Sequence, residues 1–188
     1  MFKYFFSVSL MLCCSLMANQ LHAAAVFTLK SSDIKPGASL EIAQVANNFG
    51  CTGKNISPAL SWENAPKDTR SFVLTVYDPD APTGSGFWHW VVFNIPAAAT
   101  SLPQAVGSSD KVVLPAGAIQ SRTDAGVPGF VGACPPQGDK PHRYQFTLYA
   151  LDVESLPLTA EATPAVVGFN VHFHTLAKAQ FEAFYQRK

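Results

Sequence analysis

The sequence has few charged residues and no excess of either sign. Charged side chains make up 14% of the 188 residues, and thirteen Lys and Arg balance thirteen Asp and Glu. A nucleic-acid-binding protein normally has a basic excess or a Lys/Arg-rich tract, so this composition argues against that class. Hydrophobic residues make up 48% of the chain, which argues against disorder and provides for a sizeable core.

Motifs for several kinds of chemistry are also missing. No Gly-rich phosphate loop is present, and the Gly-Ser-Gly turn at 84–86 lacks the G-x-S-x-G spacing of a serine hydrolase. His172 and His174 lie two apart on a predicted helix, where they point to different faces, and no Cys or acid stands at ligand spacing. The sequence therefore favours neither a hydrolase nor a metal site, and it implies no cofactor.

The first 25 residues have the pattern of a secretory signal peptide. Lys3 provides the positive charge, residues 5–17 are almost wholly apolar, and Ala23 and Ala25 form an A-x-A cleavage site, with cleavage after Ala23 as the alternative. The apolar run is shorter than the roughly 20 residues that a transmembrane helix needs. We therefore expect an exported protein, periplasmic or secreted, with no stable membrane anchor and a single domain over residues 26–188.

Cysteine is scarce once the leader is removed. Cys13 and Cys14 lie within the leader, and the bulky residues before them argue against a lipoprotein signal. The remaining pair, Cys51 and Cys134, is a disulfide candidate in an oxidising compartment. Such a bond would close a long loop and contribute about 4 kcal/mol in the chain-entropy model. Two separately buried thiols are the alternative.

Fourteen prolines and twelve glycines divide the chain into short segments, which favours a β-rich domain over a helical bundle. The segments 71–78, 88–95 and 143–151 have the alternating or continuous apolar pattern of strands, and residues 26–30 and 59–62 are weaker candidates. Together they predict a mainly β fold with an antiparallel core and peripheral helices.

One helix is predicted near the C-terminus. Thr163 followed by Pro164 forms an N-cap and a first helical position, and residues at helical spacing continue as far as Lys178. Periodicity leaves open whether residues 181–187 continue the helix or form a last strand.

Two turn-rich stretches place polar residues in apolar surroundings. The first runs from Asp78 to His89, and the second ends at His142. Each His alone is explained by a hydrogen-bonded core position, and Asp80 by an Asx-type turn. Two His residues and an Asp at strand–loop junctions together favour a site, because the prolines of both loops restrict the backbone and hold these side chains with little freedom.

Two catalytic or metal-binding alternatives use the same residues. Asp78, His89 and His142 could hold a metal ion, and Cys134 with His142 could form a nucleophilic pair. The second alternative requires a free thiolate, which a disulfide at Cys134 removes. We therefore favour a binding site over a catalytic one.

The two stretches resemble the signature regions of a known family. DPDAP at 78–82, followed by a Trp/His strand, and G-x-C-P-P-x-G-D-x-P-H-R-Y at 132–144 are similar to those of the phosphatidylethanolamine-binding protein family, in its bacterial YbhB/YbcL or Raf-kinase-inhibitor-like branch. The pattern N-x-S-P-x-L-x-W at 55–62 and residues 168–174 extend the resemblance over nearly the whole predicted domain. It implies a central antiparallel β-sheet packed on a smaller sheet, with helices at the side.

The resemblance also implies a small pocket for phosphate-like anions. Its protonated imidazoles would donate to phosphate, because the carboxylate beside them favours their charged form. Cys134 stands where a glycine is usual, and Gly132, Ala133 and Cys134 would supply backbone around the anion. The resemblance assigns ten residues to the pocket: Asp78, Asp80, Pro82, Phe87, His89, Gly132, Ala133, Pro136, His142 and Tyr144.

The sequence thus predicts a non-catalytic binding protein whose ligand is a phosphorylated small molecule, a lipid headgroup or a phosphorylated protein side chain, with regulation or inhibition of a partner as a related role. A surface-mediated interaction or inhibitor protein with a vestigial pocket is the first alternative, and an unrecognised hydrolase is the second. Abundant apolar residues and low charge also lead us to expect a homodimer.

Overall fold

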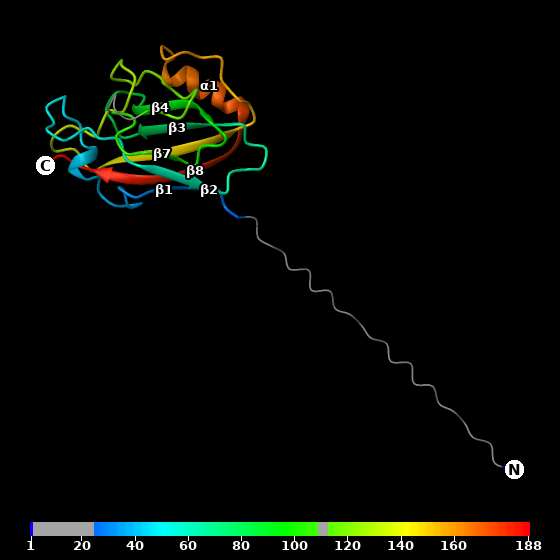
Figure 1. Cartoon of the computed structure of the whole chain (residues 1–188). Helices are drawn as coiled ribbons and strands as arrows, with labels where there is room; N and C mark the ends of the chain where they lie inside the picture. The colour runs from blue at the N-terminus through cyan, green and yellow to red at the C-terminus, as the bar shows by residue number, and fades with distance from the viewer. Residues whose placement is uncertain (2–24, 109–112) are drawn as a thin grey trace.

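The structure is a computed structural model that describes residue 1, residues 25–108 and residues 113–188 (Figure 1). The signal peptide predicted over residues 1–25, with Cys13 and Cys14, lies outside the described residues except at its two ends. No helix within the described part of the chain is long and apolar enough to span a membrane.

Five strands form a large antiparallel sheet with the spatial order β6-β4-β3-β7-β8. The central strand is buried on both faces over nearly its whole length, which explains its continuous apolar run. The strands are β3 (Ser71–Asp78), β4 (Phe87–Pro96), β6 (Ile119–Gln120), β7 (His142–Leu151) and β8 (Thr175–Tyr185).

Three short strands form a second antiparallel sheet with the order β1-β2-β5. The strands are β1 (Thr28–Ser31), β2 (Leu60–Glu63) and β5 (Ser101–Leu102), and a 3-10 helix, η1 (Ile42–Gln44), follows β1 in the chain. The main core lies between the two sheets, where Trp62 of β2 packs edge-on against Phe72 of β3 with ring centroids 5.4 Å apart. The expected β fold with a central sheet on a smaller one is therefore confirmed.

A second, smaller core lies on the other face of the large sheet, under the helix α1 (Pro164–His174). Val167 and Val171 of the helix join Val73 and Val91 of the sheet there. Consecutive residues of β3 therefore serve different cores, since side chains alternate along a strand. The large sheet is the middle of three layers, with the helix on its outer side in Figure 1.

The predicted start of α1 is confirmed, whereas its predicted end is wrong. Thr163 is the N-cap and accepts a hydrogen bond from the Val166 N–H, and Pro164 is the first helical residue. The helix ends at His174 and not at Lys178, because β8 begins at Thr175 and pairs with β7 along its whole length. Burial then recurs at every second residue (Ala179, Phe181 and Ala183), so the C-terminal segment is a strand.

The register between β3 and β4 shifts close to the end of the sheet. Val76 pairs with Trp90 and Tyr77 with Trp88, so His89 is an extra residue on β4, a β-bulge. Trp88 and Trp90, which would share a face in a regular strand, consequently face opposite sides of the sheet. The bulge frees the His89 backbone from the ladder, and its carbonyl accepts a hydrogen bond from the Val131 N–H at 2.9 Å.

Candidate functional site

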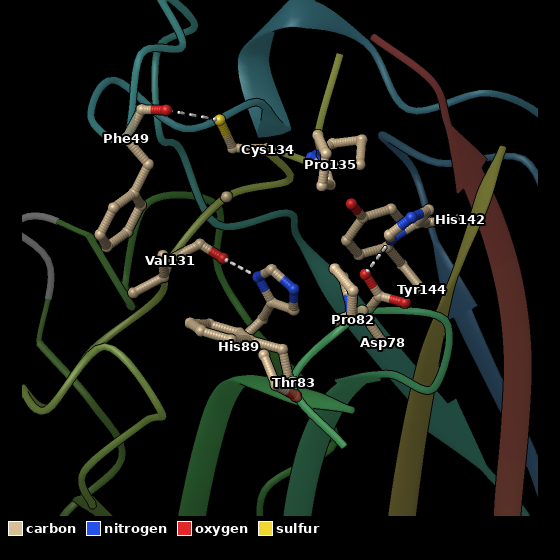
Figure 2. A pocket seen from close by; sticks show the side chains of 14 residues that line it. Phe49, Asp78, Pro82, Thr83, His89, Val131, Cys134, Pro135, His142 and Tyr144 are labelled. Carbon is tan, nitrogen blue, oxygen red and sulfur yellow. Dashed lines mark hydrogen bonds and ion pairs between the residues drawn. The ribbon is translucent and has the colours of Figure 1, made fainter. Parts of the chain in front are cut away.

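A cavity of about 170 Å³ opens where three strands of the large sheet end (Figure 2). Asp78 is the last residue of β3, Phe87 the first of β4 and His142 the first of β7. These ends meet at one edge because neighbouring strands are antiparallel. The lining consists of Phe49, Asp78, Ala81, Pro82, Thr83, Phe87, His89, Val131, Gly132, Cys134, Pro135, Pro136, His142 and Tyr144.

A buried Asp–His pair forms one wall of this cavity. Asp78 Oδ2 lies 2.7 Å from His142 Nδ1, and their side chains are only 3% and 2% exposed. Because an ionised carboxylate only accepts, Nδ1 of His142 carries the shared proton. The other carboxylate oxygen, Oδ1, accepts the Asp80 N–H at 2.8 Å. Both oxygens of Asp78 are therefore held, and the His142 ring has a fixed orientation.

The second histidine is fixed by a reciprocal contact with Val131. His89 Nδ1 lies 2.8 Å from the Val131 carbonyl oxygen, which can only accept, so Nδ1 carries a proton. Burial lowers the pKa of His89, and this effect outweighs the opposing effects of the Val131 carbonyl and the Asp78 charge. The Asp78 carboxylate favours the charged form of His89, as expected, but burial favours the neutral ring more strongly. In the neutral ring the other nitrogen, Nε2, is a hydrogen-bond acceptor.

Tyr144 brings a hydroxyl group to the same space. Its oxygen is buried and has no hydrogen-bond partner among the described residues, and Figure 2 shows it pointing into the cavity. Its ring packs edge-on against His89 with centroids 5.1 Å apart. Burial, more than the negative charge of Asp78, raises the pKa of Tyr144, so this group is a neutral donor.

The backbone of the 132–134 loop does not serve the cavity as expected. The Gly132 N–H donates to Asn55 Oδ1 at 2.7 Å, and the Ala133 N–H donates to the Gln44 carbonyl at 3.0 Å. Gly132 is required for a different close approach, since a Cβ there would lie 2.5 Å from the Gln44 carbonyl oxygen. Neither amide is available to an anion. The N–H of Cys134, in contrast, has no partner among the described residues.

Two residues assigned to the pocket lie outside its lining. Asp80 turns away and binds Arg143, with Oδ2 at 2.9 Å from Nε and Oδ1 at 3.2 Å from Nη2. The hydrogen bond from the Arg143 side chain, followed by the Arg143 N–H and the charges of Arg143 and Lys140, lowers the pKa of Asp80 to about 2 against the effect of burial. Ala133 is buried behind the cavity. The structure places the other eight residues around one space.

The disulfide between Cys51 and Cys134 is present, with Cα atoms 6.0 Å apart, so the alternative of two separate thiols is wrong. It fastens the segment with Phe49 to the cavity wall. The Cys134 sulfur also lies 3.4 Å from the Phe49 carbonyl oxygen, which is a packing contact because a disulfide sulfur has no hydrogen to donate. Phe49 is 61% exposed and forms the outer rim.

Sequence reasoning missed four lining residues: Phe49, Thr83, Val131 and Pro135. Thr83 follows Pro82 and Pro135 precedes Pro136, both of which were assigned to the pocket, so these two lining residues could have been found from their positions beside the motif residues. Phe49 becomes visible only through the disulfide two residues later. Val131 is fixed by its contact with His89, which no sequence pattern reveals.

The described residues hold no group of three or more His, Cys, Asp and Glu side chains arranged for a metal ion. Asp78, His89 and His142 line one cavity, but the first and third are paired with each other and His89 is fixed by Val131. The arrangement is instead suited to a small ligand. Apolar walls from prolines and aromatics surround a few directed polar groups, as in most small-molecule sites.

The model of the phosphatidylethanolamine-binding protein family matches residues 30–186 of this chain. The chain belongs to this family. The resemblance in the two motifs is thereby confirmed, and the protein is placed among binding proteins. Family membership alone does not identify the ligand of this cavity.

Relatives in Escherichia coli K12 share about half of the sequence. YbhB is 52% identical over 84% of this chain and 98% of its own, and YbcL is 49% identical over 88% of this chain and 90% of its own. The crystal structure of Escherichia coli YbcL, a new member of the mammalian PEBP family, has a TM-score of 0.85 and covers 87% of this chain and 100% of that chain. The fold and the YbhB/YbcL branch are therefore both supported.

Proposed function

We propose that this protein is exported and that its cavity binds a small phosphorylated group, on a lipid headgroup, a small molecule or a protein side chain, without cleaving it. The observation that carries the proposal is the Tyr144 hydroxyl, which is buried, unpartnered among the described residues and directed into the cavity. An unsatisfied buried hydroxyl costs about 1–3 kcal/mol. An acceptor oxygen of a ligand removes this cost.

The polar groups of the cavity complement a phosphate monoester. Tyr144 and the Cys134 N–H are donors that have no partner in the described part of the chain, and the neutral His89 ring presents Nε2 as an acceptor. A phosphate monoester has a second pKa of about 6, so its monoanion offers acceptor oxygens together with one O–H donor. Phosphate can therefore satisfy both kinds of group at once.

Asp78 limits the affinity of this site. Its carboxylate lies beside the cavity and opposes an anion, although one of its oxygens is already engaged by His142 Nδ1 at 2.7 Å. None of the described residues that line the cavity is an Arg or Lys that could provide bidentate or ionic contacts with the anion. We therefore expect weak binding that depends on the rest of the ligand. A headgroup with an ammonium nitrogen is favoured over inorganic phosphate, and binding to a phosphorylated partner would regulate or inhibit that partner.

Calorimetric titration of the processed, oxidised protein with phosphate, phosphoethanolamine and phosphotyrosine tests the proposal. The double variant Asp78→Asn/His142→Gln replaces the buried pair by neutral amides and avoids leaving an uncompensated charge. A matched control is Asp152→Asn/His174→Gln, which alters an exposed pair of the same type with Nδ1 and Oδ1 2.9 Å apart.

We expect phosphoethanolamine to bind, with its affinity lost in the cavity variant, which has no carboxylate to pair with the ammonium group, and kept in the control. Absence of binding across the three ligands by the folded wild-type protein would contradict the proposal. Equal loss in both variants would show that the effect is not specific to the cavity.

One observation favours the alternative of a surface-mediated interaction. Val166, Phe169 and Phe173 on α1 and Leu176 just beyond it are all between 42% and 67% exposed. This apolar surface is suited to a protein partner, and the expected homodimer would use it for a second copy. A partner retained by the Asp78→Asn/His142→Gln variant but lost on Phe169→Ser/Phe173→Ser would support this function. Light scattering of the same two variants would test the homodimer.

A further inference from the structure

A second cavity lies between the large sheet and α1. It has a volume of about 300 Å³, larger than the 170 Å³ of the first cavity. Thr75 of β3, Trp88 of β4 and Tyr149 of β7 form its floor, and the helix forms its other side through Gly168 and His172. The volume reaches the lower end of the range for small-molecule sites, which begins at about 300 Å³.

The two cavities lie on opposite faces of the sheet. Side chains alternate along β3, so Thr75 faces the second cavity, whereas its neighbour Val76 faces the core between the two sheets. Trp88 and His89 alternate in the same way on β4, so Trp88 lines the second cavity and His89 the first. A ligand in the second cavity would therefore touch none of the residues proposed to bind phosphate.

Gly168 keeps the second cavity open. Glycine in the interior of a helix is unfavourable relative to alanine, and close packing of another element is its usual explanation. Here a Cβ on Gly168 would meet no heavy atom within 4 Å, and the residue does not have a positive φ. Neither packing nor backbone conformation requires glycine at this position. Gly168 is exposed and lines the cavity, so the missing side chain leaves the open side of the cavity uncovered at the helix.

The described lining contains no Asp, Glu, Lys or Arg. Burial raises the pKa of Tyr149, the phenol of the floor, against the opposing effect of a hydrogen bond with Thr75, so this group stays neutral. Trp88 packs against Tyr77 with ring centroids 4.4 Å apart and is only partly buried, so part of the indole remains available to a second ring. An anionic ligand would lose its hydration here with no Lys or Arg of the described lining to pair with it.

We propose that this cavity is a second ligand-binding site, which takes a small uncharged aromatic molecule with a single polar N–H or O–H group. The ring lies against Trp88 and beneath Gly168, and the polar group reaches Tyr149 or Thr75. This site does not depend on the phosphate-binding function proposed above, because the two cavities share no lining residue.

Indole is a suitable probe because it is flat and uncharged and has one N–H donor. Two-dimensional NMR of the oxidised protein during titration with indole should shift the signals of Gly168, Thr175 and the Trp88 side-chain N–H. For a ligand of this size we expect a Kd on the order of 1 mM. Indole-3-carboxylate, which adds a negative charge to the same ring system, should bind at least about tenfold more weakly, since its charge would lose hydration and no Lys or Arg of the described lining would pair with it.

The variant Gly168→Leu tests the site without endangering the fold. Leu is a better helix former than Gly, and its side chain enters empty space. It should weaken indole binding at least about tenfold, which corresponds to about 1.4 kcal/mol. Asn170→Leu places the same side chain on the same helix but outside the cavity lining, and it should leave indole binding unchanged.

Three results would overturn the proposal. The first is the absence of shifts at ~10 mM indole, which exceeds the expected Kd about tenfold. The second is equal binding by Gly168→Leu and Asn170→Leu. The third is a set of shifts centred on the exposed Phe169 and Phe173, which would place indole on the outer surface of the helix. Phosphate binding measured in Gly168→Leu should equal that of the wild type, so failure of one proposal remains distinguishable from failure of the other.

Discussion

Replacing Tyr144 by Phe should make the protein more stable and a weaker binder. The hydroxyl is buried, and no described residue accepts its proton. The full cost of such a group is about 1–3 kcal/mol. The adjoining cavity of about 170 Å³ is large enough for water, which lowers the cost. We therefore expect Tyr144→Phe to raise the free energy of unfolding by about 1 kcal/mol.

The effect of Tyr144→Phe on ligand binding has the opposite sign. A hydrogen bond from the hydroxyl to a charged phosphate oxygen contributes about 1.5–3 kcal/mol. Its removal should therefore weaken the affinity for the best-bound phosphorylated ligand by roughly 10- to 100-fold. Urea unfolding measures the first quantity, and calorimetric titration of the same protein samples measures the second.

Tyr77→Phe is the matched control for both measurements. Its hydroxyl donates to the Ser85 carbonyl at 2.7 Å, so its loss should lower stability by about 1 kcal/mol or less and leave ligand affinity unchanged. The reasoning is refuted if Tyr144→Phe destabilises the protein, because the hydroxyl is then satisfied in the unliganded state. It is also refuted if Tyr144→Phe leaves the affinity unchanged.

Three further predictions concern pH and processing. Because burial lowers the pKa of His89, acidification below about pH 6.5 adds a proton to the unfolded state only, and stability should fall by up to about 1.4 kcal/mol per pH unit. His89→Gln should reduce this slope in urea unfolding at a series of pH values, and an unchanged slope would contradict the assignment. Asp80, with a pKa of about 2, should contribute about 1 kcal/mol to the free energy of unfolding above pH 3.8, and this contribution should be lost as pH falls through about 2. Asp80→Asn should remove the contribution. A pKa of Asp80 near 3.8 in the folded protein, measured by NMR, would contradict the assignment. Mass spectrometry of exported protein should show a chain starting at residue 24 or 26 with no free thiol, and an intact leader on protein recovered from the periplasm would contradict the predicted signal peptide.

The sequence indicates the site more fully than the contacts within it. The motif positions of Asp78, His142 and Tyr144 are brought together, because each stands at or near the end of a strand with a clear apolar pattern. The end of α1 could not be predicted, since residues after His174 suit a helix locally and become a strand through pairing with β7. Long-range partners decided that outcome.

The direction of individual polar groups was also beyond sequence reasoning. Asp80 is a motif residue, yet Arg143 binds it outside the cavity. Gly132 and Ala133 are motif residues as well, yet their N–H groups serve Asn55 and Gln44. A motif identifies which residues are near a site, whereas hydrogen-bond competition among neighbours decides which of their atoms face a ligand.

The extra residue in β4 makes the candidate site separable from the fold. Without His89, Val76 would still face Trp90, Tyr77 would still face Trp88, and the register would run without a shift at this end of the two strands. His89 is therefore the one residue in this stretch of β4 that has no pairing partner on β3. Deletion of a single codon should erase the ligand acceptor and leave a folded domain behind. A protein that evolved without need of the ligand could therefore lose this part of the binding site in one mutational step and keep its fold.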